Sequence, residues 1–273
     1  MPELPEVETI ARNLRQEGLQ APSIIGRAIT GVKLLWARTL ATPAPEQFAS
    51  RILGQVIKGV NRRGKFLLIQ LSRDWLIFHL RMSGDLSVRP AETALAPHDR
   101  LVLYLDRSLL LAFNDARKFG RAWLVSDPAT ILQNLGPEPL DPAFTPEDLY
   151  QRLINYKRQL KPLLLDQSFL AGIGNIYSDE ALHLAGLHPL TLSHTLTPDQ
   201  AERLWQSIRN VLQKGISLQG ASIDWVYRGG DFQNHFRVYR RTGEPCPTCG
   251  SPVQRIIVGQ RGTHYCPVCQ PKP

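Results

Sequence analysis

The cysteines constrain this chain more than any other feature. All four lie near the C-terminus, in the pattern C-x2-C, sixteen residues, C-x2-C: Cys246, Cys249, Cys266 and Cys269. This spacing fits a structural zinc site, because four thiolates close a tetrahedral shell and leave no position for chemistry. Two disulfides are the alternative, although disulfides are rare in the reducing cytosol. We therefore predict one structural Zn²⁺.

The residues between the two cysteine pairs predict a β-hairpin. Residues 253–258 and 263–265 have strand character, and residues 259–262 join them, which places Arg261 at the tip. A module too small to fold without its metal usually presents a side chain to a partner. The alternative is that Arg261 is an ordinary solvated turn residue.

The N-terminal sequence and the charge bear on location and partner. The chain begins Met-Pro-Glu-Leu-Pro-Glu, which lacks the basic start and apolar run of a signal peptide. No stretch approaches the roughly 18 apolar residues of a membrane helix, so we expect a cytosolic protein. Lys and Arg total 32 against 24 Asp and Glu, a formal charge of +8. Five of these basic residues lie between Arg51 and Lys65 without an acid, which favours a polyanionic partner.

Hydrophobic patterning predicts two regions of different secondary structure. Short apolar runs at 66–71, 75–80, 101–105, 109–113 and 121–125 predict antiparallel sheets packed as a sandwich or barrel. Residues 136–146 contain four prolines and mark a domain boundary. Helical patterns follow, most clearly at 199–214, and another helix is predicted at 3–19.

Pro2 and Glu3 form a candidate catalytic pair. Met1 is normally removed when the next residue is small, and Pro2 would then carry a free secondary amine. An α-amino group titrates near ~7.7–8.0, so a useful fraction is unprotonated at neutral pH. Such an amine can attack an electrophilic carbon and form an iminium, with Glu3 beside it to move protons. The alternative is a plain helix start, where proline and acidic residues are favoured.

Several motifs, present together and in order, resemble those of the bacterial formamidopyrimidine-DNA glycosylases, which repair oxidised bases. They are PELPEVET (2–9), RGKFLL (63–68), HLRMSG (79–84), FG (119–120), LGPEPL (135–140), GIGNIY (172–177) and QRGT (260–263).

The resemblance implies catalytic roles at four positions. Pro2 would attack the sugar C1′ of the damaged nucleotide, and Glu3 would supply the acid for ring opening. Lys65 would contact phosphate and donate a proton in β-elimination, and Arg261 would hold phosphate for δ-elimination. These residue types suit the task, since strand cleavage needs cations where phosphate leaves.

The resemblance also implies a set of DNA-contacting residues: His79, Met82, His98, Arg117, Phe119, Lys157, Lys161 and Asn175. Met82, Arg117 and Phe119 would fill the gap left by the flipped base, which costs roughly a few kcal/mol of unstacking. The alternative for Met82 and Phe119 is an ordinary core position, because Met and Phe beside strands are usually buried. The alternative for His79 and His98 is a structural role, which lone histidines usually have. Asn175 would cap the next helix within a helix–two-turn–helix motif, or cap an ordinary Gly-rich turn. Which residue of 156–158 contacts DNA is left open.

The implied fold is an α+β multidomain protein. A catalytic N-terminal antiparallel β-sandwich flanked by helices would span 1–135, with a linker at 136–146. A helix–two-turn–helix domain would span 147–225, a flexible lesion loop 226–236, and a zinc finger with a zinc-ribbon-like β-hairpin 237–273.

The implied function is a bifunctional DNA glycosylase and AP lyase. It would excise 8-oxoguanine and formamidopyrimidines, then cleave the strand by β,δ-elimination, as a monomer acting on double-stranded DNA in the cytoplasm at the nucleoid. One alternative is the sister endonuclease VIII branch, which takes oxidised pyrimidines and usually has glycine where this chain has Leu4. The other is a catalytically inactive zinc-containing DNA-binding protein.

Overall fold

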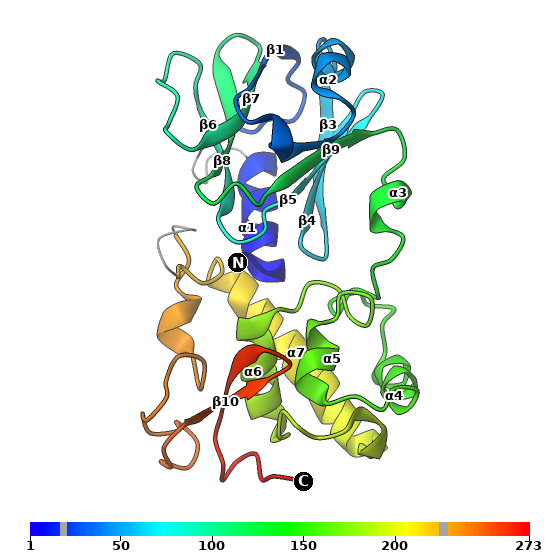
Figure 1. The fold of residues 1–273 in the computed structure, drawn as a ribbon, viewed down its shortest axis with the longest axis vertical. Helices are drawn as coiled ribbons and strands as arrows, with labels where there is room; N and C mark the ends of the chain where they lie inside the picture. The colour runs from blue at the N-terminus through cyan, green and yellow to red at the C-terminus, as the bar shows by residue number, and fades with distance from the viewer. Residues whose placement is uncertain (17–20, 224–228) are drawn as a thin grey trace. The chain divides into compact units, whose positions relative to one another are not determined.

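The computed structural model describes residues 1–16, 21–223 and 229–273. The chain divides into two compact units (Figure 1). The first contains Met1–Gln133 together with Ala221–Gly230, and the second contains Asn134–Gly220 and Asp231–Pro273. Among the described residues, no helix has both the length and the apolar character that a membrane crossing requires.

Two sheets share one apolar core in the first unit (Figure 1). The four-stranded sheet has the order β1-β7-β8-β6, formed by Ile29–Leu34, Asp99–Leu105, Leu109–Asp115 and Gly84–Pro90. The five-stranded sheet has the order β2-β9-β5-β4-β3, formed by Leu40–Thr42, Arg121–Val125, Trp75–His79, Phe66–Leu71 and Ile57–Arg63. This arrangement is the predicted sandwich.

The five strands predicted from apolar runs are confirmed as β4, β5, β7, β8 and β9. Strands β1, β2, β3 and β6 were not predicted. Polar or charged residues at the less buried positions of β1, β3 and β6 dilute the apolar signal, and β2 has only three residues. The pair β2–β9 is parallel, which departs from a purely antiparallel arrangement at one short edge.

Helix α1, Leu4–Arg15, contributes one apolar face to the same core through Val7, Ile10, Ala11 and Leu14. Across the sandwich, the rings of Phe78 and Phe113 lie 5.2 Å apart. The start of α1 is therefore fixed on the packed core. Two further helices, α2 at Pro45–Ile52 and α3 at Ala129–Leu132, and the 3₁₀ helix η1 at Ala37–Thr39 complete this unit.

The second unit is mainly helical. It contains α4 (Pro146–Ile154), α5 (Leu160–Leu165), α6 (Asn175–Ala185) and α7 (Pro198–Ser217), with the 3₁₀ helices η2 (Ser193–Thr195) and η3 (Phe232–His235). The predicted helix at 199–214 is confirmed as α7, which begins with a capping box at Thr197 and a proline at its first position. Strands β10 (Gln254–Val258) and β11 (Arg261–Tyr265) form the predicted hairpin.

The five-part division of the chain stays a prediction. Of the predicted flexible loop 226–236, residues 226–228 lie outside the described residues. Its last part is built into the fold, because Phe232 in η3 is buried and stacks on Tyr177 with ring centroids 5.0 Å apart. We therefore limit the proposed loop to the residues before Phe232.

Candidate active site and metal centre

Three residues gather at the start of α1: Pro2 and Glu3, which were predicted from the sequence, and Glu6, which was not. Pro2 is buried, and Glu3 is 2% exposed at the N-cap, where it forms a capping box with Glu6. The Glu6 carboxylate accepts the Glu3 N–H at 2.8 Å and the Ala221 N–H at 2.8 Å. Glu6 thereby fixes the peptide that follows Pro2. This role was not predicted from the sequence, although the E-x-x-E spacing of a capping box signals it.

Lys65 lies in the turn between β3 and β4, where Gly64 has a φ of +56°. The turn places Phe66 opposite His79 on β5, and the two rings meet edge to face at 4.7 Å. Burial, reinforced by the positive charges of Arg81 and Lys65, lowers the pKa of His79 to about 3. His79 Nδ1 accepts the Arg81 N–H at 3.1 Å. His79 is therefore neutral with its proton on Nε2, a donor rather than a cation.

Met82, Arg117 and Phe119 are all exposed. Met82 is 41% exposed and Phe119 54% exposed, so neither is a core residue. The Arg117 guanidinium lies 3.6 Å from the Met82 sulfur. The turn after β5 and the turn after β8 thus present these side chains on one surface of the first unit.

The side chain of Asp115, at the end of β8, forms hydrogen bonds with both of these turns. Its side chain is buried, accepts the Gly120 N–H at 2.7 Å and the Arg117 N–H at 3.2 Å, and bonds the Ser83 hydroxyl. Its backbone carbonyl accepts from Arg100 Nε at 2.8 Å. The roles of Asp115 and Ser83 were not predicted from the sequence, where the only signal was an acidic residue at the end of an apolar run, two positions before Arg117.

Two glycines let the turns pack around Asp115. A Cβ on Gly84 would lie 2.5 Å from the Leu80 carbonyl oxygen, and a Cβ on Gly120 would overlap the Phe113 ring. His98, also predicted to contact DNA, is exposed, and its carbonyl accepts the Asp115 N–H at 2.8 Å. The structure therefore gathers four of the predicted DNA-contacting residues around one buried carboxylate.

In the second unit, the start of α6 contacts the hairpin. The predicted cap at Asn175 is wrong by one residue: Gly174 is the N-cap, where glycine needs no side chain to enter the helix, and Asn175 is the first helical position. Asn175 Nδ2 instead donates to the Gly262 carbonyl at 3.1 Å. Arg261 is exposed and begins β11 directly after the hairpin turn.

Lys161 and Lys157 lie in different environments. Lys157 is exposed between α4 and α5, whereas Lys161 is fully buried. The Lys161 ammonium donates to Asp179 at 2.5 Å and to the Asn175 carbonyl at 3.0 Å. Asp179 also accepts the His264 N–H at 2.9 Å. Lys161 therefore connects α5 and α6 to the hairpin from inside the unit.

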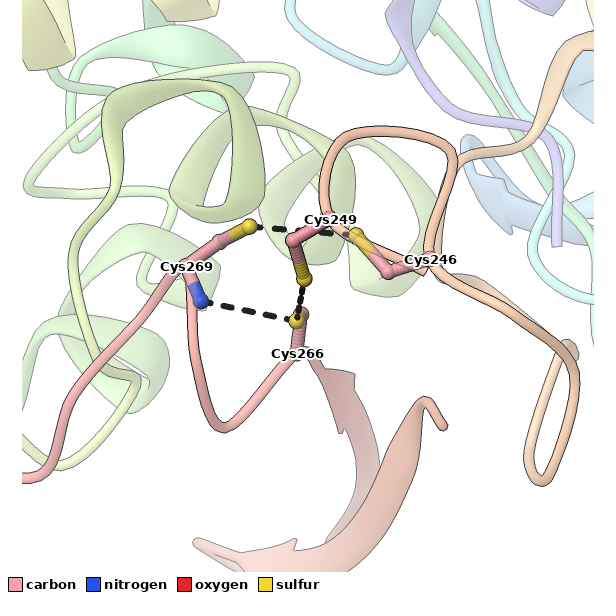
Figure 2. A group of neighbouring side chains, drawn as sticks. All are labelled: Cys246, Cys249, Cys266 and Cys269. Carbon is pink, nitrogen blue, oxygen red and sulfur yellow. Dashed lines mark hydrogen bonds between the residues drawn. The ribbon is translucent and has the colours of Figure 1, made fainter. Parts of the chain in front are cut away.

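The four cysteines converge at the base of the hairpin (Figure 2). All are free thiols, and their sulfurs lie within 4.8 Å of one another. Cys246 and Cys269 are 3.8 Å apart, and Cys249 and Cys266 are 3.4 Å apart. Tetrahedral coordination at a Zn–S distance of about 2.3 Å separates sulfurs by about 3.8 Å. The donor set and spacing therefore fit one structural zinc.

Comparison with known proteins matches most of the chain to one family. Residues 1–122 match the family model of the formamidopyrimidine-DNA glycosylase N-terminal domain, residues 135–226 its H2TH domain, and residues 243–272 a zinc finger found in FPG and IleRS. A formamidopyrimidine-DNA glycosylase of Chloroflexus aurantiacus is 50% identical over 99% of this chain and 98% of its own. This chain belongs to the formamidopyrimidine-DNA glycosylase family.

Other family members extend the match across the whole fold. A formamidopyrimidine-DNA glycosylase of Protochlamydia amoebophila is 44% identical over 100% of both chains. The Lactococcus lactis enzyme, solved in complex with abasic-site DNA, is 37% identical with a TM-score of 0.91 and covers 99% of this chain and 100% of its own. A MutM structure with carbocyclic 8-oxo-G DNA is 38% identical, with the same TM-score and coverage.

Proposed function

We propose that this formamidopyrimidine-DNA glycosylase excises oxidised purines from duplex DNA and then cleaves the strand at the resulting abasic site. The observation that carries this proposal is the match over 99% of the chain to relatives with that name. Solved relatives bind DNA that contains 8-oxoguanine analogues or abasic sites. We propose that the enzyme acts at the nucleoid in the cytoplasm, where its DNA substrate lies.

The start of α1 supports the first chemical step. After removal of Met1, the Pro2 nitrogen bonds to C1′ as the glycosidic bond breaks, and the departing base takes the bond's electron pair and the proton that the Pro2 nitrogen loses. Glu3 protonates the sugar ring oxygen when the ring opens to the iminium. The Glu6 carboxylate holds the Glu3 N–H, so the peptide that follows the nucleophile has one defined position.

Lys65 and Arg261 supply cations for strand cleavage. In β-elimination, the Glu3 carboxylate, which has given its proton to the ring oxygen, takes the C2′ proton, and Lys65 donates a proton to the phosphate that leaves C3′. Arg261 stabilises the phosphate that leaves in δ-elimination. The exposure of Arg261 at the start of β11 suits contact with phosphate. Cys246, Cys249, Cys266 and Cys269 would hold one zinc, which would fix the loops that carry the hairpin and leave no open position for chemistry.

The remaining predicted residues form the proposed DNA-contacting set. Met82, Arg117 and Phe119 enter the gap left by the flipped nucleotide, and His98 lies beside them. His79 offers its Nε2–H, and Lys157 and Asn175 contact the backbone. For Lys161 we revise the role, because a buried ammonium that holds the Asn175 carbonyl acts through Asn175 rather than on phosphate.

A duplex cleavage assay tests the proposed function. Purified protein should cleave duplexes with one 8-oxoguanine much faster than otherwise identical duplexes with one thymine glycol. The reverse preference would move the enzyme to the endonuclease VIII branch. Binding without cleavage of either duplex would identify an inactive DNA-binding protein.

Replacing Asp115 by Asn should loosen both turns that carry the proposed DNA-contacting residues. The amide keeps one acceptor oxygen but turns an NH₂ toward donors such as Gly120 N–H, so a buried hydrogen bond is lost. We expect the free energy of unfolding to fall by about 1–3 kcal/mol, with weaker binding of abasic-site duplex. Urea unfolding and fluorescence anisotropy measure these effects.

The matched control is Asp127→Asn. Asp127 is exposed, and its carboxylate accepts the Ala129 N–H at 2.8 Å through one oxygen, a hydrogen bond that an amide oxygen can keep. Its stability and DNA affinity should stay close to wild type. Equal behaviour of the two variants would contradict the bracing role of Asp115.

Stripping the metal should disorder the finger, since a module of this size depends on its zinc for folding. We expect DNA affinity to fall at least about tenfold, since the loss removes Arg261 and other positive contacts. Titration of lesion duplex into chelator-treated and zinc-restored protein measures this. Full affinity in the metal-free protein would remove the hairpin from the DNA interface.

A further inference from the structure

His183 lies against the four-cysteine centre without belonging to it. It occupies the last turn of α6 and is 3% exposed. Its Nε2 lies 3.3 Å from the sulfur of Cys246, which is equally buried. The four ligands match the zinc finger already described, so this imidazole is an additional group at the edge of that centre.

The neighbouring arginine determines which imidazole nitrogen carries the proton. Arg237 Nε lies 3.2 Å from His183 Nδ1. A guanidinium has only donors and stays charged at all physiological pH values, so His183 Nδ1 must accept. The ring proton therefore sits on Nε2, and the contact with Cys246 is an N–H···S hydrogen bond that the imidazole donates.

Arg237 is itself held in place by two further bonds. Its backbone N–H donates to Glu180 at 2.8 Å, and its Nη2 donates to the Thr248 hydroxyl at 2.7 Å. Thr248 lies between Cys246 and Cys249, and its own N–H points at the Cys246 sulfur at 3.4 Å. Helix α6 and the cysteine loop thus fix the imidazole from both sides.

We propose that His183 is a positioning residue of the zinc centre, which donates its Nε2–H to the Cys246 thiolate and slows loss of the metal. A zinc ion with four thiolates carries net negative charge, and a buried N–H donor offsets part of it. Groups that orient and polarise metal ligands in this way typically change metal affinity 10–100-fold. The inference goes beyond the proposed enzyme activity, because it concerns only the metal centre.

His183→Phe is the variant that separates this role from packing. Phenylalanine fills the site but donates no hydrogen bond. We expect the holoprotein to release zinc about 10–100-fold faster to a chromogenic chelator, and its zinc affinity in chelator competition to fall to a similar extent. His183→Gln, which keeps an N–H donor at similar reach, should recover most of the loss.

The matched control is His188→Phe. His188 is a second buried histidine of the same unit, packs against Tyr265 with centroids 4.7 Å apart, and accepts the Leu190 N–H. This variant should release zinc at nearly the wild-type rate. Zinc release unchanged in His183→Phe, or equally fast in both variants, would overturn the proposal.

The outcomes also separate this inference from the proposed function. Elemental analysis of wild-type protein should give one zinc per chain, and its absence would overturn the positioning role whatever the enzyme cleaves. Zinc release is measured without DNA, so failure to excise 8-oxoguanine leaves the His183 result intact. Conversely, unchanged zinc release in His183→Phe would leave the glycosylase proposal standing.

Discussion

Borohydride added while the enzyme processes an 8-oxoguanine duplex will link the DNA covalently to Pro2. The reductant converts the iminium between the Pro2 nitrogen and C1′ into a stable amine, so the adduct marks the nucleophile. Tryptic digestion and mass spectrometry of the trapped species locate the bond. An adduct on any lysine, including Lys65, in place of Pro2 would refute the assignment.

Blocking the same nitrogen should remove both activities. A short extension before Pro2 turns its nitrogen into an amide, and loss of a nucleophile costs several orders of magnitude in rate. Pro5→Ala is the matched control, because Pro5 lies three residues later, in the first turn of α1, and its nitrogen is already an amide. This variant should still form the trapped adduct. Wild-type turnover by protein whose intact mass retains Met1 would also contradict the mechanism.

Glu3→Gln should reduce base release from 8-oxoguanine duplex by about 10²–10⁴-fold, the usual contribution of a positioned general acid. The amide is nearly the same size and can still accept a hydrogen bond, so folding and DNA binding should change little. Single-turnover excision measures the chemical step, and anisotropy with an abasic-site analogue measures binding.

Glu46→Gln provides the comparison, since Glu46 also lies in the first turn of a helix, α2, but is exposed. Its excision rate should match wild type. If Glu3→Gln excised the base at the wild-type rate, Glu3 would have no part in the reaction. If it lost binding in proportion to excision, its role would be in assembling the site.

The parts of the site that sequence predicted are those whose partners lie close along the chain. The cysteine pairs C-x2-C carry their own geometry, and the hairpin between them follows from adjacent strands. The groups that hold the site in place instead have partners that are distant in the sequence. Glu6 bonds a residue 215 positions away, His183 one 63 positions away, and Asp115 one 32 positions away. No local pattern encodes such pairs, because only tertiary packing creates them.

The fold class was predicted correctly, and the individual strands that the sequence did not reveal were missed for the same kind of reason. Apolar runs revealed the central strands β4, β5, β7 and β8, whose residues are mostly buried. The edge strand β3, with Lys58, Arg62 and Arg63, is recognised only once β4 pairs with it. Lys161 shows what a motif cannot reveal: its position in the sequence resembles a DNA contact, yet the structure buries its ammonium against Asp179.

The bond from Ala221 to Glu6 has a consequence for the order of events during synthesis. Ala221 leaves the ribosome long after Glu6, so the anchor of the first helical turn cannot form on the early nascent chain. Pro2 is buried once folding is complete. The peptide that follows the predicted nucleophile therefore reaches its fixed position only after residue 221 has emerged from the ribosome.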